Sequence, residues 1–254
     1  MRLNDRLVYH GQFLFRWRSY LPLALLLIAA PVFAESARME AWVGDEAFSA
    51  WVYFCILVSF SGQLVRCITV GYVPVGTSGR GTKEQRAECL NTTGMYSIVR
   101  NPPYLGNFLA MLGIVMSLMV WWFVLAFVLM YWLYIEWIIW VEEDFLAKRF
   151  GAAYDKWCAV TPAFIPNISL WKAADLSFSF KTVVRREYHG LLAIVSAFLC
   201  AKSILDLGVK GQDLQQWVLT DRIEIYLFAA GCILYLVALV LTKRTRLLTV
   251  SGRS

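Results

Sequence analysis

The stretch Gly94-Met-Tyr-Ser-Ile-Val-Arg-Asn-Pro-Pro-Tyr-Leu-Gly106 places an arginine, an asparagine and two prolines directly before a long apolar run. Prolines are tolerated in the first turn of a helix, where the amides have no partners to lose. An arginine just outside a membrane helix is held at the membrane surface, where it can bind an anionic group. A second polar cluster, Glu142-Glu143-Asp144, ends the next apolar run. If the two runs form a hairpin, Arg100 and these acids return to one membrane face and form a polar site there.

Composition fixes the class of protein around this motif. Hydrophobic residues make up 59% of the 254 residues and charged residues only 17%, which is typical of an all-α polytopic membrane protein. The net charge of +6 comes from basic residues that flank apolar runs, so it indicates topology and not nucleic-acid binding. The six cysteines form no CxxC pair and there are two histidines, so we predict neither a disulfide framework nor a metal site.

Six apolar runs predict about six transmembrane helices. The stretch 105–141 has 37 residues and one charge, Glu136. As one helix it would reach roughly 55 Å, so it must fold back, and Trp121 and Trp122 mark the turn. The predicted spans are residues 20–34, 47–70, 104–119, 120–141, 190–207 and 223–241.

The charges between these runs predict an orientation. Basic residues precede the first run and follow the second, fourth and sixth, whereas the loop at residues 35–46 is predominantly acidic. Both termini should therefore be cytosolic, as in a multi-pass protein of a bacterial inner membrane. The alternative is signal-peptide cleavage after Val32-Phe33-Ala34, which would leave five spans. We divide the chain into a core, residues 1–170, and an interfacial linker with a C-terminal helix pair, residues 171–254.

Several residues around the motif are candidates for a site. Arg100 alone could be a topology anchor, but Tyr96 and Tyr104 add two aromatic walls to a defined turn. Acids at the C-terminal end of a helix oppose its dipole, so Glu142 and Glu143 call for a cationic or hydrogen-bonding partner. Glu136 lies on the same helix face as Glu143, and an ionisable group at that depth is expected to line the site. His189 is interpreted as an interfacial residue, with a direct role as the alternative.

The residues after the acidic cluster follow helical spacing. Leu146, Phe150, Tyr154 and Trp157 share one face. This pattern predicts an interfacial amphipathic helix, and it also suits a lid that lies back across the polar site.

Together, these motifs resemble the isoprenylcysteine carboxyl methyltransferase and phospholipid methyltransferase family over residues 66–166. The family pattern begins with Gly-x-Tyr and Arg-His-Pro-x-Tyr-x-Gly and continues with Glu-Glu, Leu, Phe-Gly and Tyr before a proline. The matching residues are Gly94, Tyr96, Arg100, Pro102, Tyr104, Gly106, Glu142, Glu143, Leu146, Phe150, Gly151, Tyr154 and Pro162. Asn101 replaces the family histidine, Trp157 a usual tyrosine and Ala163 a common arginine. Asn101 cannot titrate near neutrality, which puts any imidazole-dependent mechanism in doubt.

The resemblance implies a small helical membrane core that binds S-adenosylmethionine at its cytosolic face, closed over by the C-terminal segment, and methylates a lipid. The start Phe15-Arg-Trp-Arg-Ser-Tyr20 and the loop at residues 77–93 also resemble the bacterial branch whose proposed acceptors include lipid A phosphate. We expect Arg100 to bind the cofactor carboxylate and Glu142 and Glu143 its amine or ribose hydroxyls. The full predicted cofactor set is Tyr96, Arg100, Asn101, Pro102, Tyr104, Leu105, Gly106, Glu142 and Glu143, and the predicted catalytic residues are Arg100 and Glu136.

The matched region offers no evident general base, which favours an acceptor that is already deprotonated, such as a lipid phosphate or carboxylate. Methylation of a phospholipid amine is the first alternative, with Glu136 as the base. A nicotinamide-dependent enzyme of the sterol-reductase type and a small transporter are the others. A transporter would be expected to show repeated halves, which we do not find in this sequence.

Overall fold

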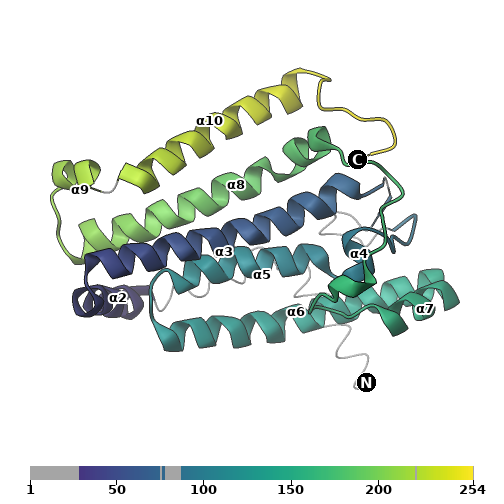
Figure 1. The fold of residues 1–254 in the computed structure, drawn as a ribbon, viewed down its shortest axis with the longest axis horizontal. Coiled ribbons are helices and arrows are strands. Elements are labelled where there is room, and N and C mark those ends of the chain that lie inside the picture. Colours follow the sequence, from purple (N-terminus) through teal and green to yellow (C-terminus); the bar gives the residue numbers. More distant parts are fainter. Residues whose placement is uncertain (1–28, 75, 78–86, 221, 254) are drawn as a thin grey trace.

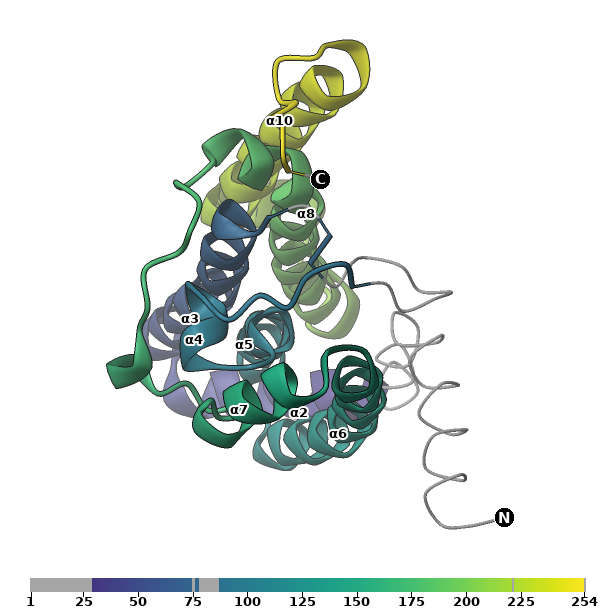
Figure 2. The ribbon, with the colours of Figure 1, turned by 90° about the vertical axis from the view of Figure 1, so that its right-hand side faces the viewer.

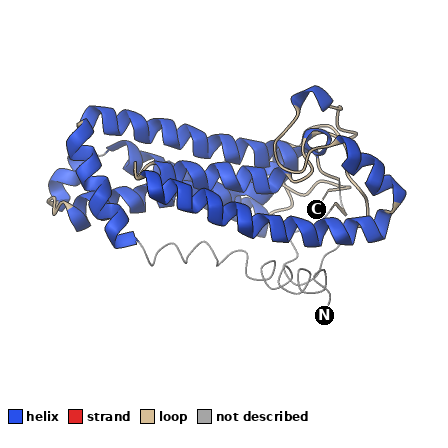
Figure 3. Ribbon diagram, turned by 90° about the horizontal axis from the view of Figure 1, so that it is seen from below, coloured by secondary structure: helices blue, strands red, loops and turns tan. Residues whose placement is uncertain are grey.

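The computed structural model describes residues 29–74, 76–77, 87–220 and 222–253, and within these ranges the chain is helical without strands (Figures 1 and 3). Its longer helices are α3 (Asp45–Tyr72), α5 (Pro102–Met116), α6 (Trp121–Phe150), α8 (Phe180–Ser203) and α10 (Arg222–Arg244). The shorter elements are α2 (Ala29–Val43), α4 (Met95–Ile98), α7 (Ala152–Val160), the 3-10 turn η2 (Ile168–Leu170), the π-helical turn η3 (Ile204–Val209) and α9 (Leu214–Thr220).

The long helices lie side by side, with α3 packed between α5 and α8, α6 beyond α5, and α10 outermost on α8 (Figures 1 and 2). The turn before α5, together with α4 and α7, gathers at one end of the bundle, which we call the motif end. The helices α2 and α9 lie at the opposite end, which we call the far end (Figure 1).

Four of these helices are long and apolar enough to cross a membrane: 45–72, 121–150, 180–209 and 223–244. The helix Pro102–Met116 is apolar but shorter. A multi-pass, all-helical architecture is therefore confirmed, and five of the six predicted runs correspond to helices. Most of the first predicted run, 20–34, falls outside the described residues, so the six-span count and its five-span alternative both remain predictions.

The predicted hairpin is confirmed. Helix α5 ends at Met116 and α6 begins at Trp121, with Met119 in a left-handed conformation (φ 56°) between them. Trp121 is 75% exposed, as expected for an indole at a membrane interface.

The predicted end of the second arm is wrong. Helix α6 does not stop at Glu142-Glu143 but continues to Phe150, where Gly151 breaks it with a φ of 50°. Lys148 and Arg149 occupy the last turn, where cations favour the helix dipole. The predicted amphipathic helix is therefore divided into two pieces, the end of α6 and the separate helix α7. The break depends on the backbone conformation of Gly151, which a hydropathy pattern does not reveal.

Close packing of α3 on α5 fixes the motif helix. A Cβ at Gly62 would lie 2.4 Å from the Gly106 carbonyl oxygen, and one at Gly113 would lie 2.3 Å from the Cys55 carbonyl oxygen. Ser59 Oγ also donates to the Ala110 carbonyl at 2.7 Å. Small residues that let backbones approach are the usual means of helix association in membranes. The start of α5 is therefore held rigidly against α3.

The predicted acidic loop at residues 35–46 is mostly helix α2, and Glu40 is buried rather than solvated. Glu40 forms an ion pair with Lys210, and its other oxygen lies 3.9 Å from Lys202 Nζ. Asp206, in the π-helical turn η3, lies 3.0 Å from Lys202 and 2.8 Å from Lys210 and accepts a hydrogen bond from Trp217 Nε1 at 3.1 Å. We call Glu40, Lys202, Asp206 and Lys210 the far-end cluster.

Candidate active site

The motif forms a tight turn between α3 and α5. Gly94 has a φ of 59°, a conformation that favours glycine, and begins the single helical turn α4. Asn101 is the residue before α5, and Pro102 occupies the first turn of that helix, as the sequence predicts. The turn therefore delivers Tyr96, Arg100 and Asn101 to the motif end of the bundle.

A segment that follows α6 lies back across this turn. We call residues 157–172 the strap. Its backbone binds the motif through Arg100 N to Pro162 O at 2.9 Å and Asn167 N to Ile98 O at 2.9 Å. Trp157 Nε1 donates to the Tyr96 carbonyl at 2.9 Å. The geometry expected of a lid is thus present.

The three residues that depart from the family pattern, Asn101, Trp157 and Ala163, all lie at the contact between the strap and the turn. Asn101 Nδ2 donates to the Ala163 carbonyl at 3.1 Å, so the side chain at position 101 docks the strap. Ala163 contributes its backbone oxygen, which any residue at that position would supply. Trp157 is buried and ties α7 to the turn.

Arg100 lies beneath the strap with a loosely paired charge. Its side chain is 13% exposed, and its Nε lies 3.3 Å from Glu143 Oε1. The guanidinium also contacts the thiol of Cys158. Among the described residues, Arg100 Nε, Glu143 Oε1 and the Tyr154 hydroxyl are all buried without an aligned hydrogen bond. Buried polar groups are normally satisfied, so a cation, an anion and a hydroxyl left in this state call for a ligand.

An open pocket of about 700 Å³ lies against Arg100. Its other walls are strap and α7 residues, including Cys158, Thr161, Pro162 and Asn167.

A second polar group lies on the neighbouring face of α6. Tyr104 donates its hydroxyl to Glu142 Oε1 at 2.8 Å, and Tyr131 donates to the Tyr104 carbonyl at 2.8 Å. Burial raises the pKa of Tyr96, and the charge of Glu142 raises it further against the lowering effect of Arg186 and Arg66.

The pKa of Tyr154 is also raised, first by burial and then by the charge of Glu143. Both Tyr96 and Tyr154 are therefore neutral hydrogen-bond donors near pH 7.

Four predicted site residues lie elsewhere or play another part. Leu105 is buried, and Gly106 faces α3, where a Cβ would meet Arg66 Cγ at 2.6 Å, so both belong to helix packing. Pro102 starts the helix. Glu136 is exposed on α6 and is not brought into the group around Arg100.

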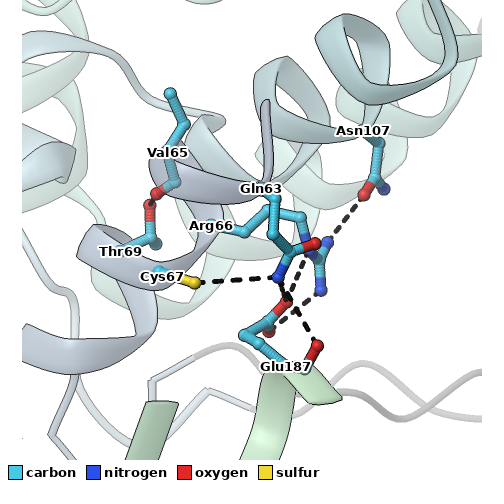
Figure 4. A network of polar contacts seen from close by, with 7 residues as sticks. All are labelled: Gln63, Val65, Arg66, Cys67, Thr69, Asn107 and Glu187. Atoms are coloured by element: carbon cyan, nitrogen blue, oxygen red, sulfur yellow. Dashed lines mark hydrogen bonds and ion pairs between the residues drawn. The ribbon is translucent and has the colours of Figure 1, made fainter. Parts of the chain in front are cut away.

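A buried charge network at the motif end escaped sequence reasoning (Figure 4). Arg66 of α3 binds Glu187 of α8 through Nε at 2.8 Å and Nη2 at 3.0 Å, and donates through Nη1 to Asn107 of α5 at 2.7 Å. Gln63 adds a hydrogen bond to Glu187 at 3.3 Å. The signal in the sequence was the presence of Gln63 and Arg66 within an otherwise apolar run.

A comparison with known protein families matches part of the same region. Residues 75–153 match the model of the family described as phospholipid methyltransferase. The protein-S-isoprenylcysteine O-methyltransferase of Schizosaccharomyces pombe is 34% identical over 87 residues, which are 34% of this chain and 37% of that protein. The chain thus spans just over a third of the length of the relative that it matches. No solved structure matches. Both comparisons agree with the resemblance drawn from the motifs, and the families that they name are S-adenosylmethionine-dependent methyltransferases.

Proposed function

We propose that this chain, whose residues 75–153 match the phospholipid methyltransferase family, is an integral-membrane methyltransferase that uses S-adenosylmethionine. The acceptor that we propose is an anionic oxygen, phosphate or carboxylate, on a membrane lipid or lipidated molecule. One observation carries the proposal: Arg100 lines an open pocket at the motif end, and it lies in a loose ion pair with Glu143, near a buried Tyr154 hydroxyl without an aligned hydrogen bond.

These residues fit a zwitterionic cofactor. Arg100 would bind its carboxylate with a charge-assisted hydrogen bond, and Glu143 and Tyr154 would receive its amine or ribose hydroxyls. Glu142, already oriented by Tyr104, would stand on the adjacent side. S-adenosylmethionine, when bound, supplies a methyl group activated by its sulfonium. The protein's contribution is to position that group and exclude water, which is the role in which the strap would serve.

The titration behaviour of the site favours an acceptor that needs no base. Asn101 cannot accept a proton near neutrality, and the raised pKa values of Tyr96 and Tyr154 keep both phenols protonated. His189 is exposed on α8 and packs against the rings of Tyr188 and Tyr235. A phosphate or carboxylate oxygen arrives deprotonated and can attack directly.

Methylation of a lipid amine is the second candidate, because Glu136 is an ionisable residue exposed on the apolar part of α6. Such a residue in a membrane helix is more often functional than accidental. Here Glu136 would take the proton from an ammonium headgroup.

Cofactor binding is the first test. Equilibrium dialysis of radiolabelled S-adenosylmethionine against the purified protein in detergent should give saturable binding. Arg100→Ala should lose about 1.5–3 kcal/mol, or roughly 10- to 150-fold in affinity. Arg149→Lys, an exposed change on α6, is the control. Undiminished binding in both Arg100→Ala and Glu143→Gln would remove this site from the proposal.

The product identifies the acceptor. Membranes containing the protein are supplied with methyl-labelled cofactor and the labelled lipids are treated with mild base. A methyl ester of a carboxylate releases its label as methanol, whereas a methyl ester of a phosphate survives mild base and is identified by mass spectrometry of the labelled headgroup. Either product supports the anionic oxygen. A base-stable N-methyl label that is lost in Glu136→Gln would establish the second candidate instead.

Orientation is tested separately. A reporter fused after Ser254 should be cytosolic, and Trp42→Cys, at a position 79% exposed in α2, should react with an impermeant thiol reagent from outside. The reverse labelling pattern would place the motif end on the wrong side for a cytosolic cofactor.

A further inference from the structure

The network of Arg66, Asn107 and Glu187 lies at one level of the bundle. Arg66 is six residues before the end of α3, Glu187 seven residues after the start of α8 and Asn107 five after the start of α5. At the helical rise these positions are about 8–10 Å inside the motif end. If the helix ends lie at the membrane surface, this level is where a lipid headgroup joins its acyl chains.

The guanidinium of Arg66 is rigidly held, but not all of its N–H groups are hydrogen-bonded. Its fork binds both oxygens of Glu187, and Asn107 takes one N–H of Nη1 (Figure 4). Of the five N–H groups of an arginine, two have no partner in the part of the chain that the structure describes. The side chain of Arg66 is 25% exposed whereas that of Glu187 is 3% exposed. The Glu187 carboxylate is thus buried beside Arg66, and the Arg66 side chain remains partly accessible at one edge.

This edge adjoins the proposed cofactor site. Asn107 follows Tyr104 by one helical turn on α5, and Tyr104 holds Glu142. The charges of Glu142, Arg186 and Arg66 all act on the Tyr96 hydroxyl. Arg66 is thus connected to the proposed cofactor site through Asn107 and Tyr104 of α5.

We propose that Arg66 binds the anionic headgroup of the lipid acceptor, with Glu187 and Asn107 as positioning residues that fix its guanidinium. The inference rests on the proposed function and names the residue that selects its acceptor. A planar fork with two N–H groups left over suits a phosphate or carboxylate, and rigid placement lowers the ordering cost of binding. It also gives α8, outside the matched family region, a part in the site.

Lipid binding in detergent micelles, without turnover, tests this. The probes are fluorescent phosphatidic acid and fluorescent phosphatidylcholine with the same acyl chains. Wild type should retain phosphatidic acid more tightly. Arg66→Lys keeps the positive charge but loses the planar guanidinium, so it should weaken phosphatidic acid binding about tenfold. It should leave phosphatidylcholine binding and the Kd of S-adenosylmethionine unchanged. Asn107→Ala should also weaken phosphatidic acid binding, by a smaller factor. Arg149→Lys is the matched control.

Equal affinity of wild type and Arg66→Lys for phosphatidic acid would overturn the inference. An equal loss of phosphatidic acid and phosphatidylcholine binding in Arg66→Lys would also overturn it, because it would indicate a general structural change. If Arg66→Lys does not fold, the result with Asn107→Ala decides by the same criteria. Excess inorganic phosphate distinguishes the source of the anion: a lipid site keeps its lipid, and displacement would show a free-phosphate site and overturn the lipid assignment. Failure of wild type to bind S-adenosylmethionine would refute the proposed function while leaving the lipid measurement interpretable.

Discussion

The two ends of the bundle both bury charges, but they do so in opposite ways. At the far end Asp206 is fully buried, contacts two lysines within 3.0 Å and accepts a bond from Trp217. At the motif end Arg100 and Glu143 meet at 3.3 Å, are partly exposed and stand beside a pocket. A fully buried charge cluster fixes a structure, whereas a longer ion pair that is partly exposed beside a pocket is accessible to a ligand. We therefore interpret the far end as structural and propose the motif end as the site.

The largest effect on stability should come from the far end. Asp206→Asn removes a buried carboxylate from Lys202 and Lys210, both of which also lie close to Glu40. Removing one partner from a buried ion cluster costs about 3–5 kcal/mol. Thermal unfolding in detergent should show a large fall in midpoint, while cofactor affinity measured well below that midpoint is retained. Asp155→Asn, at an exposed position on α7, is the control. A fall in cofactor affinity matching that of Arg100→Ala would contradict the division between the two ends.

A smaller loss is expected at the α3–α5 contact that supports the motif. Gly62→Ala places a Cβ 2.4 Å from the Gly106 oxygen and 2.5 Å from the Ala110 nitrogen. Backbone atoms cannot move aside cheaply, so we expect overpacking to cost about 1–3 kcal/mol of unfolding free energy. Gly208→Ala in η3 meets its nearest atom at 4.0 Å and should be neutral or slightly stabilising. Equal melting of the two variants would disprove the close packing.

The contrast between the ends also shows what a sequence can predict. The helical hairpin followed from residue types whose effects are local: prolines at a helix start and tryptophans at a turn. The end of α6 was misplaced because it depends on the backbone of Gly151, and hydropathy does not report a φ angle. The pairing of Arg66 with Glu187 joins residues 121 positions apart, and Glu40 is buried by partners on η3. Such contacts follow from which helix faces meet, and the charge pattern of one chain does not determine that.

The strap can be loosened at Gly151. Its backbone angles, φ 50° and ψ −130°, are unfavourable for any residue with a Cβ, so Gly151→Ala should cost about 1–3 kcal/mol. We expect a loss of cofactor affinity as well, because α7 leads into the strap. Gly211→Ala at the far end has a comparable φ of 67° and free space around it. It should lower the melting midpoint without changing cofactor binding. Equal cofactor affinity in both variants would separate the strap from the site.

A modest effect is expected from the phenol that orients Glu142. Tyr104→Phe removes the 2.8 Å hydrogen bond to the carboxylate and keeps the aromatic ring. A hydrogen bond to a charged group contributes about 1.5–3 kcal/mol at most, and partial exposure of this pair reduces the expected loss to about 1 kcal/mol. Cofactor affinity should fall several-fold by equilibrium dialysis. Tyr131→Phe, which frees only the Tyr104 carbonyl, is the comparison variant and should change it less. The reverse order would show that Glu142 does not contact the cofactor.

The smallest expected effect is the pH dependence of cofactor affinity, which distinguishes Asn101 from the histidine of the family pattern. Burial raises the pKa of both Tyr96 and Tyr154 above that of an ordinary phenol, which is about 10. A raised pKa in the folded state means that the folded protein holds these protons more tightly. Their contribution to stability is therefore complete below pH 10 and is lost only as the pH rises beyond it.

With no imidazole at position 101, cofactor affinity should be flat between about pH 6 and 9. Asn101→His should introduce a titration near pH 6–7, because the new side chain lies beside Arg100 and the Ala163 carbonyl that Asn101 now binds. Dialysis across this range, with wild type and Asn101→His in parallel, measures both curves. A wild-type affinity that titrates near pH 6–7 would require a group other than Asn101 to carry the proton, and the first variant to examine would then be His189→Asn.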